Sequence, residues 1–543
     1  MLNYSFKTPL SILIILAILV YSFFIYQTIF YIDGHLYFTL VDDAMISMNY
    51  AKHLADGHGI VWNIGDDPIQ GFSNLGWMLY MSLIHLLPVD PSKISLLIMI
   101  TSIFILISLA ITIYFITYGL YRTSKQTAFL ATIITIFYFP LVYWSLRGME
   151  VGLVTLFIYL SIYFAFKLES IPNYLNALKL GVLMFCAVIT RFDSSAQISL
   201  IVLYLFITGL KNGQLKLHSI PIIFFIFSIL GLFTFQYFYF GDMLPNTYQL
   251  KVLGVSIFER IDVGLDVFFD YAFRDFSALF FIVIGGLLYY KELRTYKITL
   301  LLGLFLIQVF YSIYVGGDYA EPYNSPQVDA ANRFITQGMP ALFVIFSIIT
   351  MKFIQDLVRI KTNNNFQINF LTTFGIGFAA LAIICAEPWY KSLSKPWYIL
   401  PSKPWYKSQQ HVYTRIPLLK ADIWRAKLGV HINQNTSKDT VIAAHATGQI
   451  PYFSNRRTID MLGISDSHIA NSEPKTKFRS GHNKWDYNYS IGSLLPDLVA
   501  DEWGNSPKYL RQHKYYKKLK NRIWIRRDSI LINIDGLDKR FNK

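Results

Sequence analysis

Long apolar runs dominate the first two thirds of this chain of 543 residues. Runs of about 20 residues, enough to cross a roughly 30 Å hydrocarbon core as an α-helix, recur between Leu10 and Ala386. Lipid offers no partners to backbone amides and carbonyls, so such runs predict helices that pair these groups internally. With 54% hydrophobic and only 15% charged residues, a single soluble domain could not cover this chain with a polar surface. The chain is therefore predicted to be a polytopic α-helical membrane protein.

The composition changes after the last apolar run. Residues 387–406 contain the tripeptide PWY three times at a period of eight residues. Trp and Tyr favour the membrane interface and Pro prevents a regular helix, so an interfacial linker is predicted, with a sugar-binding aromatic platform as the alternative. Residues 407–543 are more polar, and β-like runs such as TVIAAH, RRTIDML and RIWIRR alternate there with turns. The expected parts are a transmembrane domain at 1–386 with a first outer loop at 33–72, the linker, and a soluble α/β domain at 407–543.

Basic loops predict how the helices are oriented. The loop KELRTYK at Lys291–Lys297 is placed on the cytoplasmic side, because Lys and Arg are enriched in cytoplasmic loops. Counting alternately from it places further basic segments on the same side: Tyr121–Lys125, the loop around Lys167, Lys211–Lys216 and Lys352–Asn365. The opposite side receives Arg147–Glu150, Arg191–Asp193, Gly241–Lys251, Gly316–Arg333 and the C-terminal domain. The segments with chemically capable side chains are thus predicted to share the outer face.

The number of spans depends on one short segment. Ser73–Leu87 must begin and end on the outer side if the later spans are to keep their parity. We interpret it as a half-inserted or re-entrant helix, which gives about 11 spans, or 12 or 13 if a span elsewhere is missed.

Two adjacent carboxylates open the helical part of the first outer loop. In DDAMISMNYAKHLADGHGI, Ile46, Tyr50 and Leu54 share one helical face, which predicts a helix lying on the membrane. Either Asp42 or Asp43 would be well placed as a helix N-cap. The functional alternative is that one carboxylate takes a proton from an acceptor hydroxyl while the other orients that acceptor or binds a divalent cation.

The other candidate residues also have a functional and a structural reading. Arg191 and Asp193 interrupt an apolar stretch, either as an ion pair that shapes a turn or with Arg191 as a bidentate phosphate ligand. Lys251 and Arg333 would bind phosphate or extend toward lipid headgroups. The remaining acidic and amide candidates, each with a helix-terminus or turn role as its alternative, are Glu150, Asp242, Asn246 and Asp318.

The run DDAMISMNYAKHLADGHGIVWN closely resembles the first outer loop of the GT-C superfamily of membrane glycosyltransferases. The resemblance is strongest to the bacterial group typified by the mycobacterial terminal arabinofuranosyltransferase. Further similar segments follow in order: YWSLRGMEVGL, ITRFDS, YFYFGDMLPNTYQLK, GGD at Gly316–Asp318 with Arg333 and Pro340 downstream, and DTVIAAHATGQIPYFSNRRTIDMLGISDSHIA. The resemblance covers nearly the whole chain.

This resemblance implies an enzyme that moves a sugar from a polyprenyl-phosphate donor to an envelope glycan, lipopolysaccharide or other acceptor at the outer face of a bacterial inner membrane. It implies Asp42 and Asp43 as catalytic residues, with Asp42 preferred as the base. The implied donor-binding residues are Glu150, Arg191, Asp193, Asp242, Asn246, Lys251, Asp318 and Arg333. The insert at 320–332 is expected to influence acceptor specificity, and His445, Asp460 and His482 match family-like positions without an assigned role.

Two other functions remain open: a transporter or flippase of lipid-linked sugars, and a catalytically inactive glycan-binding relative. A transporter predicts repeated halves with paired broken helices, and the sequence has no convincing internal repeat. No cofactor is certain, although Asp42 and Asp43 would suit Mg, Mn or Ca. The net charge of +14 is attributed to cytoplasmic loops and anionic membrane lipids, and no nucleic-acid partner is expected. Cys186 and Cys385 lie in apolar stretches and give no support to a disulfide.

Overall fold

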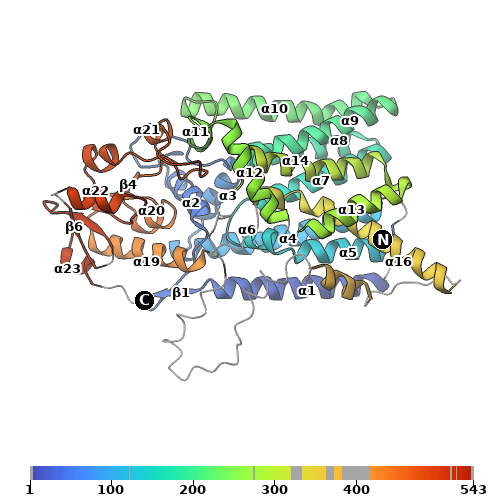
Figure 1. The fold of residues 1–543 in the computed structure, drawn as a ribbon, viewed down its shortest axis with the longest axis horizontal. Helices are drawn as coiled ribbons and strands as arrows, with labels where there is room; N and C mark the ends of the chain where they lie inside the picture. The colour runs from blue at the N-terminus through green and yellow to red at the C-terminus, as the bar shows by residue number, and fades with distance from the viewer. Residues whose placement is uncertain are drawn as a thin grey trace, which may run out of the picture.

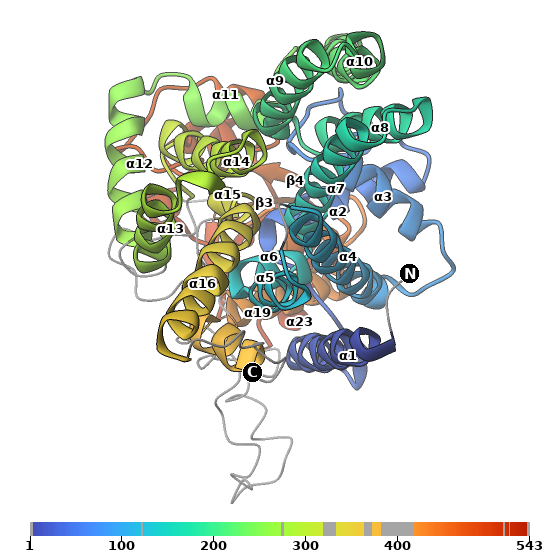
Figure 2. The ribbon, with the colours of Figure 1, turned by 90° about the vertical axis from the view of Figure 1, so that its right-hand side faces the viewer.

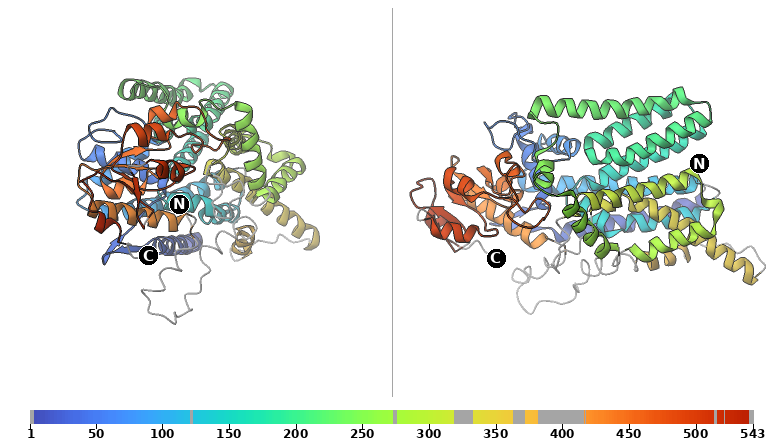
Figure 3. Two further views of the ribbon diagram at one scale, coloured as in Figure 1. Left: turned by 60° about the vertical axis from the view of Figure 1, so that its left-hand side comes forward. Right: turned by 45° about the horizontal axis from the view of Figure 1, so that its top comes forward.

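The structure, a computed structural model, describes residues 4–120, 123–272, 276–318, 333–362, 372–381, 416, 418–513, 516–520 and 522–539. The predicted linker at 387–406, the insert at 320–332 and Cys385 lie outside the described residues. The rest forms an elongated molecule with a helical bundle at one end and the C-terminal domain at the other (Figures 1 and 3).

Long apolar helices build the bundle. They are α1 (Tyr4–Gln27), α4 (Pro91–Gly119), α5 (Lys125–Ile136), α6 (Phe139–Leu146), α7 (Val151–Ser170), α8 (Tyr174–Thr190), α9 (Ser195–Lys211), α10 (Leu215–Phe240), α13 (Ser277–Tyr289), α14 (Tyr296–Tyr314) and α16 (Met339–Thr362). Seen along the bundle, α4, α7 and α16 lie toward its centre and α1 lies at its edge (Figure 2). Large apolar side chains such as Phe104, Phe227 and Phe281 are exposed on the bundle surface, as expected of a surface that faces lipid.

Seven helices of the described chain are long and apolar enough to cross a membrane. A further pair, α5 and α6, passes the same criteria together but is bent by 50° at its break. Three shorter apolar helices in the described residues are α8, α13 and Thr372–Leu381. The prediction of a multi-pass membrane protein is confirmed, and the number of 11 to 13 spans stays a prediction.

The basic loops meet at the end of the bundle away from the C-terminal domain (Figure 1). Lys297 forms an ion pair of 3.0 Å with Glu169, and Lys352 forms one of 3.0 Å with Glu292. The Lys211 ammonium lies 5.2 Å from the ring centroid of Tyr296. Loops that are far apart in sequence, but were predicted to share a side, therefore lie together.

The first outer loop connects the bundle to the C-terminal domain. It contains a hairpin of β1 (Phe30–Ile32) and β2 (His35–Tyr37), then α2 (Asp42–Ala55) and α3 (Leu75–His85). With 11 residues, α3 rises by roughly 16 Å, about half the hydrocarbon thickness. Its last residue, His85, places Nε2 3.1 Å from the hydroxyl of Tyr452 in the C-terminal domain. The half-inserted helix predicted for Ser73–Leu87 stays a prediction.

The C-terminal domain is built on a five-stranded sheet in the order β4-β3-β5-β7-β6. Strand β3 (Val441–Ala444) is parallel to β4 (Arg457–Asp460) and β5 (Leu498–Val499), whereas β7 (Trp524–Arg526) is antiparallel to β5 and β6 (Tyr516–Lys518). Side chains of β3 alternate between two hydrophobic clusters, because successive residues of a strand point to opposite faces. Its helices are α19 (Leu419–Asn435), α20 (Gln449–Ser454), α21 (Ser467–Ala470), α22 (Ser506–Gln512) and α23 (Ile534–Leu537), with a π-helical turn at Asn488–Ser493.

Three smaller elements complete the outer end of the bundle: α11 (Asn246–Val252), α12 (Ile257–Tyr271) and α15 (Arg333–Thr336). Short turns of 3-10 helix at Phe192–Ser194 and Lys291–Leu293 precede α9 and α14.

Buried polar contacts hold the C-terminal domain against the outer loop and the bundle. The indole N–H of Trp62 donates to the carbonyl of Thr458 in β4 at 2.8 Å. Arg147, in the turn between α6 and α7, forms an ion pair of 2.5 Å with Asp422 of α19, and both side chains are completely buried. The domain is therefore positioned relative to the bundle by directional bonds as well as by apolar contacts.

Candidate functional site

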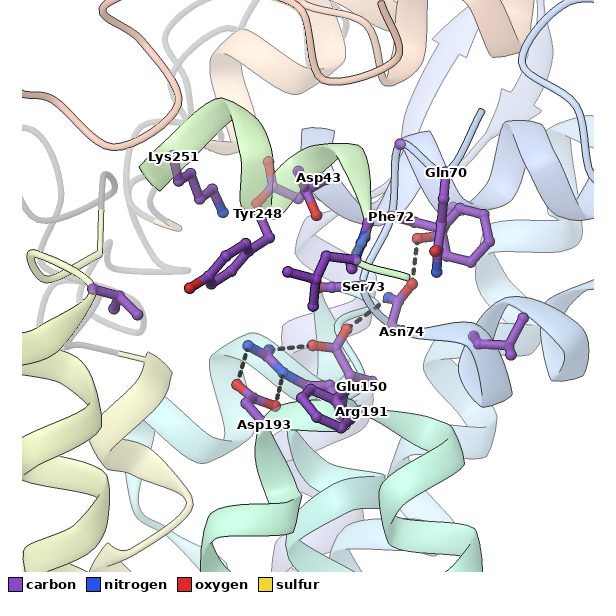
Figure 4. A pocket seen from close by; sticks show the side chains of 18 of the residues that line it. Asp43, Gln70, Phe72, Ser73, Asn74, Glu150, Arg191, Asp193, Tyr248 and Lys251 are labelled. Carbon is purple, nitrogen blue, oxygen red and sulfur yellow. Dashed lines mark hydrogen bonds and ion pairs between the residues drawn. The ribbon is translucent and has the colours of Figure 1, made fainter. Parts of the chain in front are cut away.

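A cavity of about 400 Å³ lies where the bundle meets the first outer loop (Figure 4). Its wall combines α2, residues 70–75, the start of α7, the junction of α8 and α9, α11, the end of α14 and α15. Its charged lining residues are Asp43, Glu150, Arg191, Asp193, Lys251 and Arg333. Six of the ten predicted site residues, drawn from five separate segments, therefore surround one space.

Arg191 lies at a break between two helices. It has extended backbone angles (φ −158°, ψ 116°) after α8, and Phe192–Ser194 form one 3-10 turn before α9 begins. Its Nε and Nη2 donate to the two carboxylate oxygens of Asp193 at 2.7 and 2.6 Å, and Nη1 donates to Glu150 Oε1 at 2.5 Å. These contacts use three of the five N–H donors of a guanidinium group, which leaves donors on its terminal nitrogens for a ligand.

Arg333 makes a second arginine cluster with two carboxylates. Its Nη1 lies 2.7 Å from Asp43 Oδ2, and its Nε lies 3.1 Å from Asp318 Oδ2. The ring of Phe334 is close to both guanidinium groups, with its centroid 5.5 Å from Arg191 Cζ and 5.3 Å from Arg333 Cζ. Both cations are held by opposite charge and by an aromatic ring that they share.

Asp318 owes its position to the two glycines before it. Gly316 and Gly317 have φ angles of +84° and +76°, a left-handed conformation that costs glycine little and other residues much more. A Cβ at Gly316 would collide with the Phe478 ring, and one at Gly317 would collide with Val267. The turn thus brings Asp318, which is 3% exposed, to Arg333.

Lys251 extends from α11 toward the cavity (Figure 4). Among the described residues, no acceptor lies within hydrogen-bond distance of its ammonium group, in contrast to Arg191 and Arg333. Burial lowers its pKa and Arg333 lowers it further, whereas Asp43 and Asp318 oppose this shift. Of the three cations that line the cavity, Lys251 is therefore the one whose positive charge is least neutralised by nearby carboxylates of the described residues.

The two adjacent carboxylates of α2 face different surroundings. Asp43 lines the cavity, and although burial raises its pKa, Arg333 and Lys251 together hold that pKa below its usual value. Asp42 does not line the cavity, and its Oδ1 accepts a hydrogen bond of 3.2 Å from the Gly448 amide of the C-terminal domain. Burial, opposed by Arg425 and reinforced by Asp422, raises the pKa of Asp42 to about 7.

The predicted divalent cation gains no geometric support from this arrangement. Asp42 and Asp43 bond to different partners, and the described part of the chain contains no group of three His, Cys, Asp or Glu residues placed to hold a metal ion. The residues do not fit a shared ion, and the cation stays a prediction.

Asn246 and Asp242 lie outside the cavity lining. The amide of Asn246 donates to the carbonyls of Gly463 and Ile464 at 2.9 and 2.8 Å, so it attaches α11 to the C-terminal domain. Asp242 is exposed in the bend after α10.

The three unassigned positions in the C-terminal domain also have defined surroundings. Asp460 accepts hydrogen bonds from the amides of Leu462, Gly463 and Ser465, and so shapes the turn that receives Asn246. His445 Nδ1 lies 3.1 Å from Asp501. Burial lowers the pKa of His482 to about 4, close to the charges of Asp43 and Lys251.

Two lining residues that the sequence reasoning missed are Ser47 and Asn74. The Ser47 hydroxyl donates to Asn74 Oδ1 at 2.8 Å, and Asn74 Nδ2 donates to Glu150 Oε2 at 2.8 Å. Ser47 could have been found, because it lies four residues after Asp43 and so shares its helical face. Asn74, an uncharged residue before an apolar helix, carries no such signal.

A family model matches the C-terminal domain. Residues 409–532 match a family described as a domain of unknown function, DUF8728. No curated protein matches the chain.

Solved structures are similar over nearly the whole chain. The oligosaccharyltransferase of Archaeoglobus fulgidus, tethered to an acceptor peptide containing the NVT sequon, is 11% identical, with a TM-score of 0.52 over 92% of this chain and 69% of that chain. ArnT from Cupriavidus metallidurans is 9% identical in the apo state, with a TM-score of 0.53 over 98% of this chain and 99% of that chain. ArnT bound to undecaprenyl phosphate is 10% identical, with a TM-score of 0.53 over 96% and 98%. These are GT-C glycosyltransferases, so the predicted GT-C fold is confirmed; the closer likeness to the arabinofuranosyltransferase group stays a prediction.

Proposed function

We propose that this chain is a glycosyltransferase that takes a sugar from a polyprenyl-phosphate carrier and adds it to an acceptor at the outer face of a bacterial inner membrane. The observation that carries this proposal is the cavity in which Asp43 and Lys251 meet at the junction of the bundle and the outer loop. In this proposal a lipid chain would approach the cavity from the bundle and a polar acceptor from the outer side. The ArnT structure that is similar over nearly the whole chain was solved with undecaprenyl phosphate, a ligand of the proposed class.

The charged lining residues fit the two tasks of a glycosyl transfer, which are deprotonation of the acceptor hydroxyl and stabilisation of the leaving phosphate. Asp43 would accept the proton of the acceptor hydroxyl while the acceptor oxygen bonds to the anomeric carbon of the sugar. The bond between that carbon and the phosphate oxygen breaks, and its electron pair leaves with the polyprenyl phosphate. Lys251 and the remaining N–H donors of Arg191 would stabilise the growing phosphate charge, and nearby carboxylates would stabilise the oxocarbenium-like sugar.

This proposal moves the role of base from Asp42, the first preference from the resemblance, to Asp43. Asp43 lines the cavity and is kept ionised by Arg333 and Lys251. Asp42 contacts Gly448 and would act through the placement of α2. Other predicted donor-binding residues also have positioning roles. Glu150 and Asp193 form ion pairs with Arg191, and Asp318 forms one with Arg333. Asn246 attaches α11 to the C-terminal domain.

The sugar and acceptor are proposed by class only. The resemblance to the terminal arabinofuranosyltransferases makes a pentose the first sugar to offer, and an envelope glycan or lipopolysaccharide the first acceptor. For orientation, the clustering of Lys211, Lys297 and Lys352 at the far end of the bundle supports a cytoplasmic location for that end. The cavity and the C-terminal domain would then face the periplasm.

The test offers purified full-length protein radiolabelled polyprenyl-phosphate pentose and hexose, beside nucleotide sugars, with total envelope glycan as acceptor. We expect label to move from a lipid-linked sugar, and to be lost in Asp43→Asn and strongly reduced in Lys251→Met. Asp439→Asn, a change of an exposed carboxylate of the C-terminal domain that does not line the cavity, serves as the matched control and should stay near the wild-type rate. Transfer from nucleotide sugars alone would overturn the proposal. Movement of the lipid-linked sugar across vesicles without transfer would instead favour the flippase.

A further inference from the structure

A chain of hydrogen bonds links the helix that carries Asp43 to the helix break that carries Arg191. It begins with a bond of 2.8 Å from Ser47 on α2 to Asn74. It continues from Asn74 to Glu150 at 2.8 Å and from Glu150 to Arg191 at 2.5 Å (Figure 4). Asn74 and Ser47 are 5% and 2% exposed, so water does not compete freely for these bonds.

The bonding pattern determines which way the Asn74 amide points. Glu150 accepts a hydrogen bond through each of its two oxygens, one from Arg191 and one from Asn74, so the Asn74 atom that faces it must be the NH₂ group. The Asn74 carbonyl oxygen then faces Ser47, which must donate to it. Reversing the amide would place its oxygen against Glu150 Oε2 and leave these two oxygens without a donor.

Asn74 also limits the orientation of the Glu150 carboxylate. One Glu150 oxygen is bound to Arg191 and the other to Asn74, so the carboxylate is held from two sides in one orientation. Glu150 in turn fixes Nη1 of Arg191, while Asp193 holds the opposite edge of the same group. A small rotation of Glu150 would therefore change where the remaining N–H donors of Arg191 point in the cavity.

We propose that Asn74 is a positioning residue, which holds Glu150 so that Arg191 presents its remaining N–H groups to the phosphate of a lipid-linked donor. The inference rests on the proposed function, because it assigns Arg191 to the donor phosphate. Asn74 lies across the cavity from Lys251, and the two would engage the phosphate differently: Lys251 by contact, Asn74 through Glu150 and Arg191 (Figure 4).

The decisive variant is Asn74→Asp, because its effect depends on pH in a way that simple loss of packing does not. At pH 8 the new carboxylate would lie against Glu150. The other charged groups nearby are Arg191 and Asp193, which form an ion pair next to Glu150, and Asp43, which lies one turn from Ser47 on α2. Two adjacent carboxyl groups take up a shared proton as the pH falls, and the introduced side chain, once protonated, donates to Glu150 as the native amide does. Asn74→Leu fills the space but has no donor at any pH.

The measurement is kcat/KM for the polyprenyl-phosphate sugar between pH 8 and 5.5, each value taken as a ratio to wild type at the same pH. We expect both variants to be lowered about 100-fold at pH 8, the size of effect that small misplacements of catalytic groups produce. Asn74→Asp should regain up to about tenfold per pH unit while the pair titrates, whereas Asn74→Leu should stay flat. Asn176→Asp, at a buried asparagine of α8 that bonds a carbonyl at the far end of the bundle, should show no such recovery.

A second readout separates this proposal from the function on which it rests. The shift in Tm on adding undecaprenyl phosphate is measured for the same proteins over the same pH range, and should follow the same order as kcat/KM. Wild-type protein that shows this shift but transfers no sugar would refute the proposed function and leave the positioning role measurable. Two results would refute the positioning role in a wild-type protein that transfers sugar. One is a kcat/KM of Asn74→Asp equal to that of wild type at pH 8. The other is an equal lowering of kcat/KM in both variants at every pH.

Discussion

Asp42 and Asp43 are neighbours in the chain, yet their surroundings give them opposite acid–base properties. Asp43 faces Arg333 and Lys251, which keep it ionised, whereas Asp42 faces Gly448 and the acidic Asp422. Consecutive helical residues point about 100° apart, so a boundary between cavity and domain interface can separate them.

The pH dependence of transfer distinguishes the two carboxylates. If Asp43 is the base, its lowered pKa keeps it ionised above about pH 5, and kcat/KM should show no acid-side loss between pH 6 and 8. Asp43→Asn should lower kcat by at least about 100-fold, the usual range for a general base. A loss of wild-type activity below pH 7, together with loss of transfer at every pH in Asp42→Asn, would assign the base to Asp42 instead.

Asp42 should also make stability depend on pH. Its folded-state pKa of about 7 lies above the usual value of 3.8 for an aspartate, so folding favours the protonated form. The corresponding stability is complete below about pH 4 and is lost as the pH rises through 7. Asp42→Asn retains an acceptor for the Gly448 amide and removes the ionisation, so it should raise Tm at pH 8, with a gain that shrinks toward pH 4. A gain of equal size at both pH values would contradict the assignment.

Among the elements, the turn at Gly316–Asp318 depends most closely on residue type. Gly317→Ala forces a side chain into a left-handed conformation against Val267, at a cost of roughly 1–2 kcal/mol before any collision. Because this turn places Asp318 against Arg333, we expect a lower Tm and a higher KM for the donor. Gly285→Ala, in α13 with no atom within 4 Å of the added methyl, is the matched control and should be neutral or slightly stabilising. Equal effects of both changes would show that the turn has no special role.

At the scale of the whole molecule, the Arg147–Asp422 pair joins the bundle to the C-terminal domain without contact with water. Removing Arg147 leaves a buried carboxylate whose next cation, Arg425, is 3.5 Å away. Arg147→Leu should therefore destabilise the protein by about 3–5 kcal/mol, and the double variant with Asp422→Leu should recover much of that loss. Thermal unfolding and the rate at which protease releases the C-terminal domain would measure the cycle. Additive losses would mean that the two side chains act independently.

Sidedness is also a property of the whole molecule. In a protein without Cys186 and Cys385, a thiol reagent confined to the outer side should label Asp242→Cys but not Arg294→Cys, two exposed positions at opposite ends of the bundle. The reverse pattern would refute the orientation and, with it, the outer-face donor.

Much of the architecture follows from local properties of the sequence. Apolar runs of spanning length require helices in lipid, basic loops gather on one side, and β-like runs contain β3, β4 and β7. The motifs also identified six residues that line one cavity, because charged residues at the ends of apolar helices are costly without a partner or a role.

Only the tertiary structure decided which side chains bond to one another. Arg333 reaches Asp43 across 290 residues of sequence, and Arg191 reaches Glu150 across 41. These contacts assign Asp43 to the cavity and Asp42 to the domain interface, commit both arginines to carboxylates, and leave Lys251 without a close partner among the described residues. They also place Asn74, which the sequence did not single out, beside the cavity, and they place Asn246 against the C-terminal domain. Periodicity and loop charge report the face on which a residue lies. A hydrogen bond between distant segments requires its donor and acceptor to be placed to within a few tenths of an ångström, and only packing defines that placement.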